Sequence, residues 1–125
     1  MSLLEVKNLH TYFKTKKGIV KAVNDVTYSL DAGKTLGIVG ESGSGKSVSA
    51  MSIIKLLDGN GYIESGEITF DGKDIRNVTL NSLRSQIGFV QQDVYLFSGS
   101  VYENIAYGRP GASQEEVIRA AKLAG

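Results

Sequence analysis

The chain has 125 residues, which is enough for one domain and excludes a multidomain enzyme. Its 14 lysines and arginines against 13 aspartates and glutamates leave a net charge of +1, too balanced for binding nucleic acid or a membrane surface by charge alone. The absence of cysteine excludes disulfides and thiolate metal sites, and the longest stretch without a charged residue, 94–102, is far shorter than the roughly 20 residues that span a bilayer. We therefore expect a soluble, cytoplasmic, globular protein with no nucleic-acid partner.

The N-terminal part has the pattern of antiparallel strands. Two apolar runs, 4–13 and 19–23, flank the turn-like residues 16–18, which indicates a β-hairpin. Apolar and polar residues then alternate over 26–30, which predicts a strand with one buried face, and residues 31–33 predict a turn.

The next segment predicts a strand, a loop and a helix in succession. Residues 35–39 form a short continuous apolar run bounded by glycines, which predicts a strand at 34–39 that is covered on both faces. The glycine-rich residues 40–47 follow directly. Apolar residues at helical spacing between Lys46 and Leu57 predict a helix, which residues 58–61 end.

Beyond this helix the sequence returns to a hairpin pattern. Ile68 and Phe70 alternate with polar residues, and Asp71 with Gly72 is a favoured two-residue hairpin turn, so we expect a short return strand through Ile75. Residues 87–90 are a second apolar run and predict a second buried strand.

The C-terminal segment predicts helices. Residues 80–85 and 100–107 favour short helical segments. Ser113, with Glu116 three residues later, forms a capping box that begins a last helix, and Val117, Ile118 and Ala121 share one face of it.

The glycine-rich segment is a full match to the phosphate-loop (Walker A) pattern G-x-x-x-x-G-K-[ST]. Its residues are Gly40, Glu41, Ser42, Gly43, Ser44, Gly45, Lys46 and Ser47. Its glycines let the backbone N–H groups of residues 43–46 point at a phosphate, Lys46 offers charge to the β- and γ-phosphates, and the Ser47 hydroxyl can bind Mg²⁺. A glycine-rich turn without a ligand is the alternative, but a lysine in the first helical turn opposes the helix dipole unless an anion neutralises it.

With these motifs the chain resembles the nucleotide-binding domain of an ATP-binding cassette (ABC) transporter. Residues 3–74, with the segments 8–13, 33–47 and 66–68, resemble the peptide-importer branch. Residues from about 82, with the segments 87–97 and 104–108, resemble the exporter branch. We hypothesise an engineered chimera joined near residues 75–80, with a natural intermediate as the alternative.

The resemblance implies further site residues. Phe13 would stack on adenine, with Tyr12 as the alternative, and Val48 would complete the nucleotide site. Gln92 would contact Mg²⁺ and the attacking water, beside Ser47 as the other metal ligand. Lys46 and Gln92 are therefore parts of an incomplete catalytic set, because the 125 residues contain no signature motif, no Asp-Glu strand and no switch histidine of the family.

Together these patterns predict an α/β fold, a truncated P-loop NTPase core with an antiparallel β-subdomain. We expect the chain to be the N-terminal half of such a domain, with the β-subdomain at 1–33 and 62–76, the phosphate-loop strand and helix at 34–58, and a second core strand, glutamine loop and helices at 77–125. The 34–39 and 87–90 strands would share a parallel sheet.

The expected function is Mg-ATP or Mg-ADP binding with little or no hydrolysis by the chain itself. The alternatives are an active transporter ATPase subunit when the missing half complements it, and a ligand-free assembly scaffold. Uncovered sheet edges and the apolar face of the last helix predict a homodimer or larger assembly, and a membrane transporter subunit is a partner by resemblance only.

Overall fold

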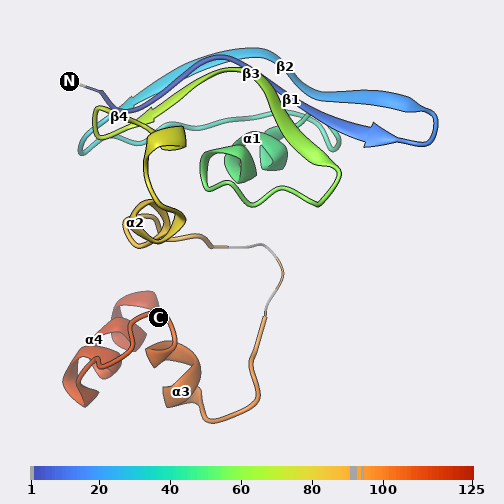
Figure 1. Ribbon diagram of the computed structural model, residues 1–125. Coiled ribbons are helices and arrows are strands. Elements are labelled where there is room, and N and C mark those ends of the chain that lie inside the picture. The colour runs from blue at the N-terminus through green and yellow to red at the C-terminus, as the bar shows by residue number, and fades with distance from the viewer. Residues whose placement is uncertain (1, 91–92, 94) are drawn as a thin grey trace. The chain divides into compact units, whose positions relative to one another are not determined.

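The computed structural model describes residues 2–90, 93 and 95–125. The chain forms two compact units, Met1–Gly88 and Phe89–Gly125, which are considered separately (Figure 1).

The first unit is built on an antiparallel sheet (Figure 1). Its strands are β1 (Ser2–Thr15), β2 (Gly18–Asp31), β3 (Gly61–Phe70) and β4 (Lys73–Asp74), in the order β2-β1-β3-β4. The predicted first hairpin is confirmed, because β1 and β2 pair along their whole length. The predicted strand at 26–30 is the far end of β2 rather than a separate element.

The Asp71–Gly72 turn between β3 and β4 is also confirmed. Asp71 has a φ of 51° and Gly72 a φ of 76°, and positive φ at both central residues is the geometry of a type I′ hairpin turn.

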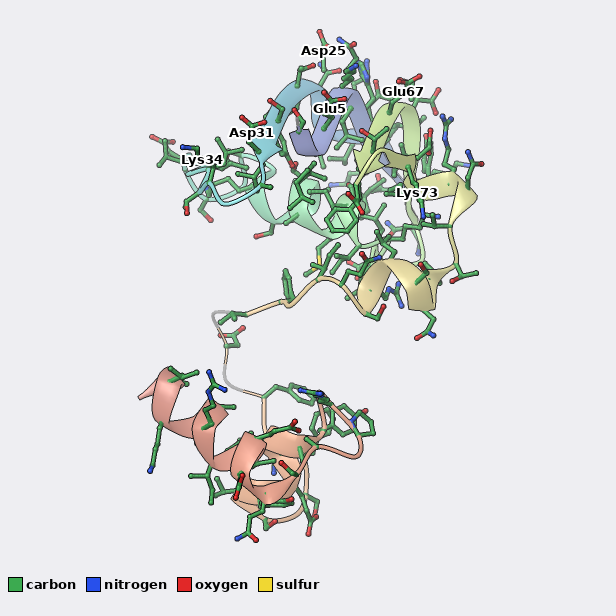
Figure 2. All side chains as sticks on the ribbon, turned by 90° about the vertical axis from the view of Figure 1, so that its left-hand side faces the viewer. Glu5, Asp25, Asp31, Lys34, Glu67 and Lys73 are labelled. Carbon is green, nitrogen blue, oxygen red and sulfur yellow. The ribbon has the colours of Figure 1, made fainter. Side chains whose placement is uncertain are left out.

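One face of the sheet carries the core of this unit. The buried core side chains are Val6, Leu9, Val23, Ile68, Ile75 and Leu83. The side chains of Glu5, Asp25 and Glu67 lie on the face of the sheet away from α1 (Figure 2). This is the two-residue alternation expected of a sheet with one covered face.

Helix α1 (Lys46–Ile53) packs on the core face of the sheet with hydroxyl groups as well as with the partly buried Val48 and Ile53. Its buried residues are Ser49 and Ser52, where the apolar spacing predicted a hydrophobic face. The helix is also shorter than the predicted 46–57, because Lys55 adopts a φ of 55°, outside helical geometry. Arg84 donates hydrogen bonds to the carbonyls of Ile54 (3.0 Å) and Lys55 (2.9 Å) just beyond its end.

The predicted strands at 34–39 and 87–90 are not formed, and the parallel sheet that they would share was a wrong prediction for the part of the chain that the structure describes. Both segments are irregular, and Val39 and Val90 are 94% and 97% exposed. An apolar run becomes a central strand only when strands flank it, and the described strands all belong to the antiparallel sheet.

Two short helical segments complete the first unit. They are the 3₁₀-helix η1 (Ile75–Asn77) and α2 (Leu80–Arg84), which confirms the helical segment expected near 80–85. Thr79 caps α2 by accepting a hydrogen bond from the Ser82 N–H at 3.1 Å.

The second unit contains α3 (Val101–Ala106) and α4 (Gln114–Ala124), both close to the predicted helices. The capping box of Ser113 and Glu116 at the start of α4 is confirmed, with both hydrogen bonds present. Of the predicted apolar face, Val117 is buried, whereas Ile118 is 44% exposed and Ala121 is exposed. No helix in the described ranges combines the length and hydropathy needed to cross a membrane.

Candidate functional site

The phosphate-loop motif forms a glycine-shaped turn at the start of α1. Gly43 and Gly45 have φ values of 82° and 90°, in the left-handed region where glycine is favoured, and Gly45 is the N-cap residue of the helix. A Cβ atom at Gly45 would collide with the carbonyl oxygen of Ala22 on β2. Position 45 therefore needs glycine for both its conformation and its close approach to the sheet.

Lys46 folds its ammonium group back over the loop. Its Nζ donates hydrogen bonds to the carbonyl oxygens of Gly40 and Glu41 (2.8 Å to Glu41) and to Ser44 Oγ (3.2 Å). These acceptors are neutral, and the first turn of α1 has no acidic residue. An anion at the loop would thus be the first negative partner of both this ammonium group and the helix N-terminus.

A β-bulge on β2 brings the sheet against the loop. Thr11 pairs with Val23 and Tyr12 pairs with Lys21, so Ala22 is an extra residue between two consecutive pairs. Ala22 is also the residue whose carbonyl abuts Gly45. Because β2 is an edge strand of the sheet, no further strand of the described sheet pairs with its outer side.

An open cavity of about 380 Å³ lies between the loop and β2. Its lining residues are Lys21, Ala22, Val23, Asn24, Val26, Tyr28, Ile38, Val39, Gly40, Ser44, Gly45, Lys46 and Ser49. They include two lysines and no carboxylate, beside an aliphatic group from β2 and from residues 38–39. The cavity thus combines lysine side chains among its lining residues with an apolar wall.

Two hydroxyl pairs fix α1, and with it the loop, on the sheet. Tyr28 and Ser49, both in the cavity lining, share a hydrogen bond of 2.8 Å between Tyr28 Oη and Ser49 Oγ. Deeper in the unit, Thr11 Oγ1 lies 2.9 Å from Ser52 Oγ, and Ser52 donates to the Val48 carbonyl at 2.7 Å. Both pairs join α1 to strands β1 and β2, which form the predicted first hairpin.

The structure brings together only some of the predicted site residues. Gly40, Ser44, Gly45 and Lys46 line the cavity, but the other predicted loop residues do not. Those others are Glu41, Ser42, Gly43 and Ser47, all exposed, and Val48, which packs against the core. Gln92, the predicted partner for Mg²⁺, lies outside the described residues.

The two aromatic candidates for adenine lie on the first hairpin, outside the cavity lining. The Phe13 ring covers Gly61, where an added Cβ atom would be 2.6 Å from Phe13 Cε1. The Tyr12 ring packs edge-on against Tyr62 and His10, with ring centroids 6.2 and 6.1 Å away. Which of the two stacks on a base stays a prediction.

Sequence reasoning missed Lys21, Asn24 and Tyr28 as lining residues. The alternation over 26–30 placed Tyr28 on a strand face but could not show which element covers that face. No sequence pattern pointed to Lys21, because its place in the cavity lining depends on the bulge at Ala22.

The charged groups elsewhere in the described residues do not form a metal site. No cluster of three or more His, Cys, Asp or Glu side chains occurs among them. The Arg76 side chain, which donates hydrogen bonds to the Asp74 carboxylate, lowers the pKa of Asp74 from 3.8 to about 2. This pair joins β4 to η1 and is not part of the cavity lining.

Comparison with known proteins identifies relatives that share this segment. A Bacillus subtilis protein described as "Uncharacterized ABC transporter ATP-binding protein YwjA" is 51% identical over 102 residues, which are 82% of this chain and 17% of that protein. The oligopeptide transport ATP-binding protein OppD of Haemophilus influenzae is 52% identical over 95 residues, 73% of this chain and 29% of its own length. Heavy metal tolerance factor 1 of Caenorhabditis elegans is 43% identical over 121 residues, 97% of this chain and 14% of its own length.

A solved structure also matches. The structure of a bacterial Atm1-family ABC exporter with ATP bound superposes on this chain with a TM-score of 0.84 and 37% sequence identity. The match covers 97% of this chain and 20% of the exporter chain. The chain thus spans less than a third of the length of these relatives. The family model described as "ABC transporter" matches residues 23–125, a range that includes the phosphate loop and most of the cavity lining. The chain therefore belongs to the ABC transporter family.

Proposed function

We propose that the chain binds ATP and ADP, with Mg²⁺, in the cavity between the phosphate loop and β2. The observation that carries this proposal is the composition of the lining. It includes two lysines and no carboxylate, beside a loop in which Gly43 and Gly45 adopt left-handed conformations. The relatives named as ATP-binding proteins, and the solved exporter with ATP bound, support the choice of nucleotide.

Each part of the nucleotide has a candidate partner. The N–H groups of residues 43–46 and the Lys46 ammonium group would hold the β- and γ-phosphates, and Ser47 would ligate Mg²⁺, with Gln92 as its proposed second contact. Exposed Ser47 lies in the first turn of α1, directly after Lys46. Aliphatic residues of the lining offer an apolar surface to the base, and Phe13, or alternatively Tyr12, would stack on it.

We further propose that these 125 residues by themselves hydrolyse ATP slowly or not at all. Phosphoryl transfer depends on groups that position the attacking water and stabilise charge, and the described cavity lining contains no carboxylate for that task. The alternatives are an active transporter ATPase subunit formed with further protein segments and a ligand-free scaffold. Phosphate release by the purified chain at about 1 s⁻¹ or faster, abolished by Lys46→Ala, would contradict the proposal.

Calorimetric titration with ATP and ADP, with and without Mg²⁺, tests the binding proposal. Lys46→Ala removes a charge-assisted contact to phosphate and should weaken binding by at least ~1.5 kcal/mol, about tenfold in Kd. Lys17→Ala is the matched control, because Lys17 is an exposed lysine in the first hairpin turn. Equal affinities for wild type and Lys46→Ala would overturn the assignment of the loop.

A second titration assigns the aromatic residue. If Phe13 stacks on adenine, Phe13→Ala weakens ATP binding more than it weakens binding of inorganic triphosphate. If Tyr12 stacks instead, Tyr12→Ala is the substitution with this selective effect. If both ligands weaken alike with Phe13→Ala, the ring has a packing role against Gly61.

For partners, we propose self-association and attachment to a membrane transporter on its cytoplasmic side. Exposed apolar residues on α4, such as Ile118 at 44% and Leu123 at 80%, favour a symmetric homodimer or larger assembly. Light scattering at about 100 μM should show a dimer or larger species without nucleotide, and a monodisperse monomer would contradict this.

The names of the relatives, which include transport and ABC transporter proteins, support the transporter role. The engineered-chimera hypothesis is not tested by these matches.

A further inference from the structure

Tyr28 reaches from β2 to the start of the phosphate-loop helix. It pairs with the fully buried Val6 on β1, so its side chain lies on the core face of the sheet, where α1 packs. The ring packs against the core, and its Oη lies 2.8 Å from Ser49 Oγ. Ser49 is buried and, like Tyr28, lines the cavity. This hydroxyl pair therefore lies on the same face of the sheet as the loop and at the loop end of α1.

Ser49 is bonded directly to the last glycine of the loop. Its backbone N–H donates to the carbonyl of Gly45, the N-cap residue of α1, at 2.9 Å. Strand β2 thus holds the start of the helix at two points, because the Ala22 carbonyl lies against Gly45 and the Tyr28 hydroxyl bonds to Ser49. Two points of contact restrain the tilt of a helix end as well as its position, whereas a single point leaves the tilt free.

We propose that Tyr28 is a positioning residue that aligns the phosphate loop for the polyphosphate part of the nucleotide. The inference rests on the proposed nucleotide binding and gives a role to a residue outside the phosphate-loop motif. Loop N–H groups bind phosphate well only when they converge on it, so a change in the tilt of α1 should weaken several phosphate contacts at once. The other hydroxyl pair, Thr11 with Ser52, lies about one turn farther from the loop and should affect stability more than affinity.

Titration with inorganic triphosphate tests the proposal, at a temperature where circular dichroism shows each variant to be folded. Tyr28→Phe keeps the ring and removes the hydroxyl, so triphosphate should bind about fivefold more weakly, the size of one neutral hydrogen bond. ATP should weaken by the same factor, because the change acts on the phosphates. Ser49→Ala removes the other hydroxyl of the pair and should give the same loss, and the double variant should lose no more than either single variant.

Two variants are matched controls. Tyr62→Phe removes a tyrosine hydroxyl outside the cavity lining and should bind triphosphate as wild type does. Thr11→Val removes the hydroxyl partner of Ser52. It should lower the thermal midpoint about as much as Tyr28→Phe does but weaken triphosphate less than about twofold. This comparison separates the alignment of the loop from stability in general.

Distinct outcomes overturn this inference and the proposed function. If wild type binds neither triphosphate nor ATP, nucleotide binding fails and Tyr28 has no role. If Lys46→Ala weakens binding but Tyr28→Phe and Ser49→Ala do not, only the role of Tyr28 is overturned. Equal losses of affinity in Tyr28→Phe and Thr11→Val would indicate a general packing effect and also overturn it. A loss for ATP without a loss for triphosphate would indicate a contact with the nucleoside in place of a positioning role.

Discussion

The two units of the chain are stabilised in different ways. Among the described residues, seven of the eight buried hydrophobic side chains belong to the first unit, and Val117 alone belongs to the second. The first unit is joined by contacts between distant segments, such as the pairing of Leu4 with Phe70 and of Thr11 with Ser52. The second relies on local hydrogen bonds, above all those of Asn104 with Phe97 and Ser100.

This difference explains why the candidate site lies in the first unit. A phosphate loop needs a fixed backbone, and nonlocal packing of a helix on a sheet supplies it. Regions with few buried apolar contacts open more readily, so we expect the helices of the second unit to have the lower local stability.

The largest expected effect comes from the core of the sheet. Leu9 is fully buried, and Leu9→Ala should lower the free energy of unfolding of the first unit by about 3 kcal/mol. Hydrogen exchange measured on the whole chain should show lost protection in Met1–Gly88 and unchanged protection in Phe89–Gly125. Leu123→Ala, at a residue 80% exposed, is the control with an effect under about 0.5 kcal/mol. Equal loss in both units would show that they unfold as one.

A smaller effect is expected at the contact between the loop and the sheet. Gly45→Ala introduces a Cβ atom against the Ala22 carbonyl, at a residue whose φ is 90°. The substitution should therefore lower the free energy of unfolding by about 1–3 kcal/mol and weaken nucleotide binding. Chemical denaturation and titration of the same sample measure both. Gly59→Ala, where an added Cβ meets no atom within 4 Å, should behave like wild type. Unchanged binding in Gly45→Ala would mean that the loop does not need this contact.

In the second unit, Asn104→Ala should have an effect of about 1 kcal/mol, confined to that unit. The side chain accepts from the Phe97 N–H at 2.8 Å and donates to the carbonyls of Phe97 and Ser100 at 3.1 and 2.9 Å. Faster hydrogen exchange should appear at residues 97–107 only. If protection is lost in the sheet as well, the proposed independence of the units is wrong.

The smallest effect concerns Asp74, whose pKa falls from 3.8 to about 2 beside Arg76. A lowered folded-state pKa contributes stability that is complete above the unfolded value and is lost as the pH falls toward 2. Asp74→Asn should therefore lower the thermal midpoint slightly at pH 7, and its difference from wild type should shrink between pH 4 and pH 2. A difference in thermal midpoint that stays constant between pH 4 and pH 2 would show that ionisation of Asp74 does not contribute to stability.

Features governed by neighbouring residues could be predicted from the sequence. The Asp71–Gly72 turn and the capping box at Ser113 follow from the chemistry of two to four adjacent residues, and both are present. The loop at 40–47 was found the same way, since its glycines, its lysine and its last serine stand at the fixed positions of an eight-residue pattern.

Features governed by distant residues were missed or mispredicted. Ser49 and Ser52 are buried because Tyr28 and Thr11, 21 and 41 residues away, supply hydroxyl partners. The runs at 34–39 and 87–90 have the composition of central strands, but composition cannot show whether flanking strands exist. The position of Lys21 depends on a single extra residue in a strand, which no apolar pattern reveals.

The serines beneath α1 limit how this protein can be engineered. Hydroxyl pairs are directional, so a slip of one helical turn, about 5.4 Å, would break both of them, whereas aliphatic contacts tolerate such a slip. Ser49 and Ser52 are both buried, so leucine or valine there would overpack the contact and leave the hydroxyls of Tyr28 and Thr11 without these partners. Selection for heat resistance and selection for ligand affinity should therefore favour the same two serines.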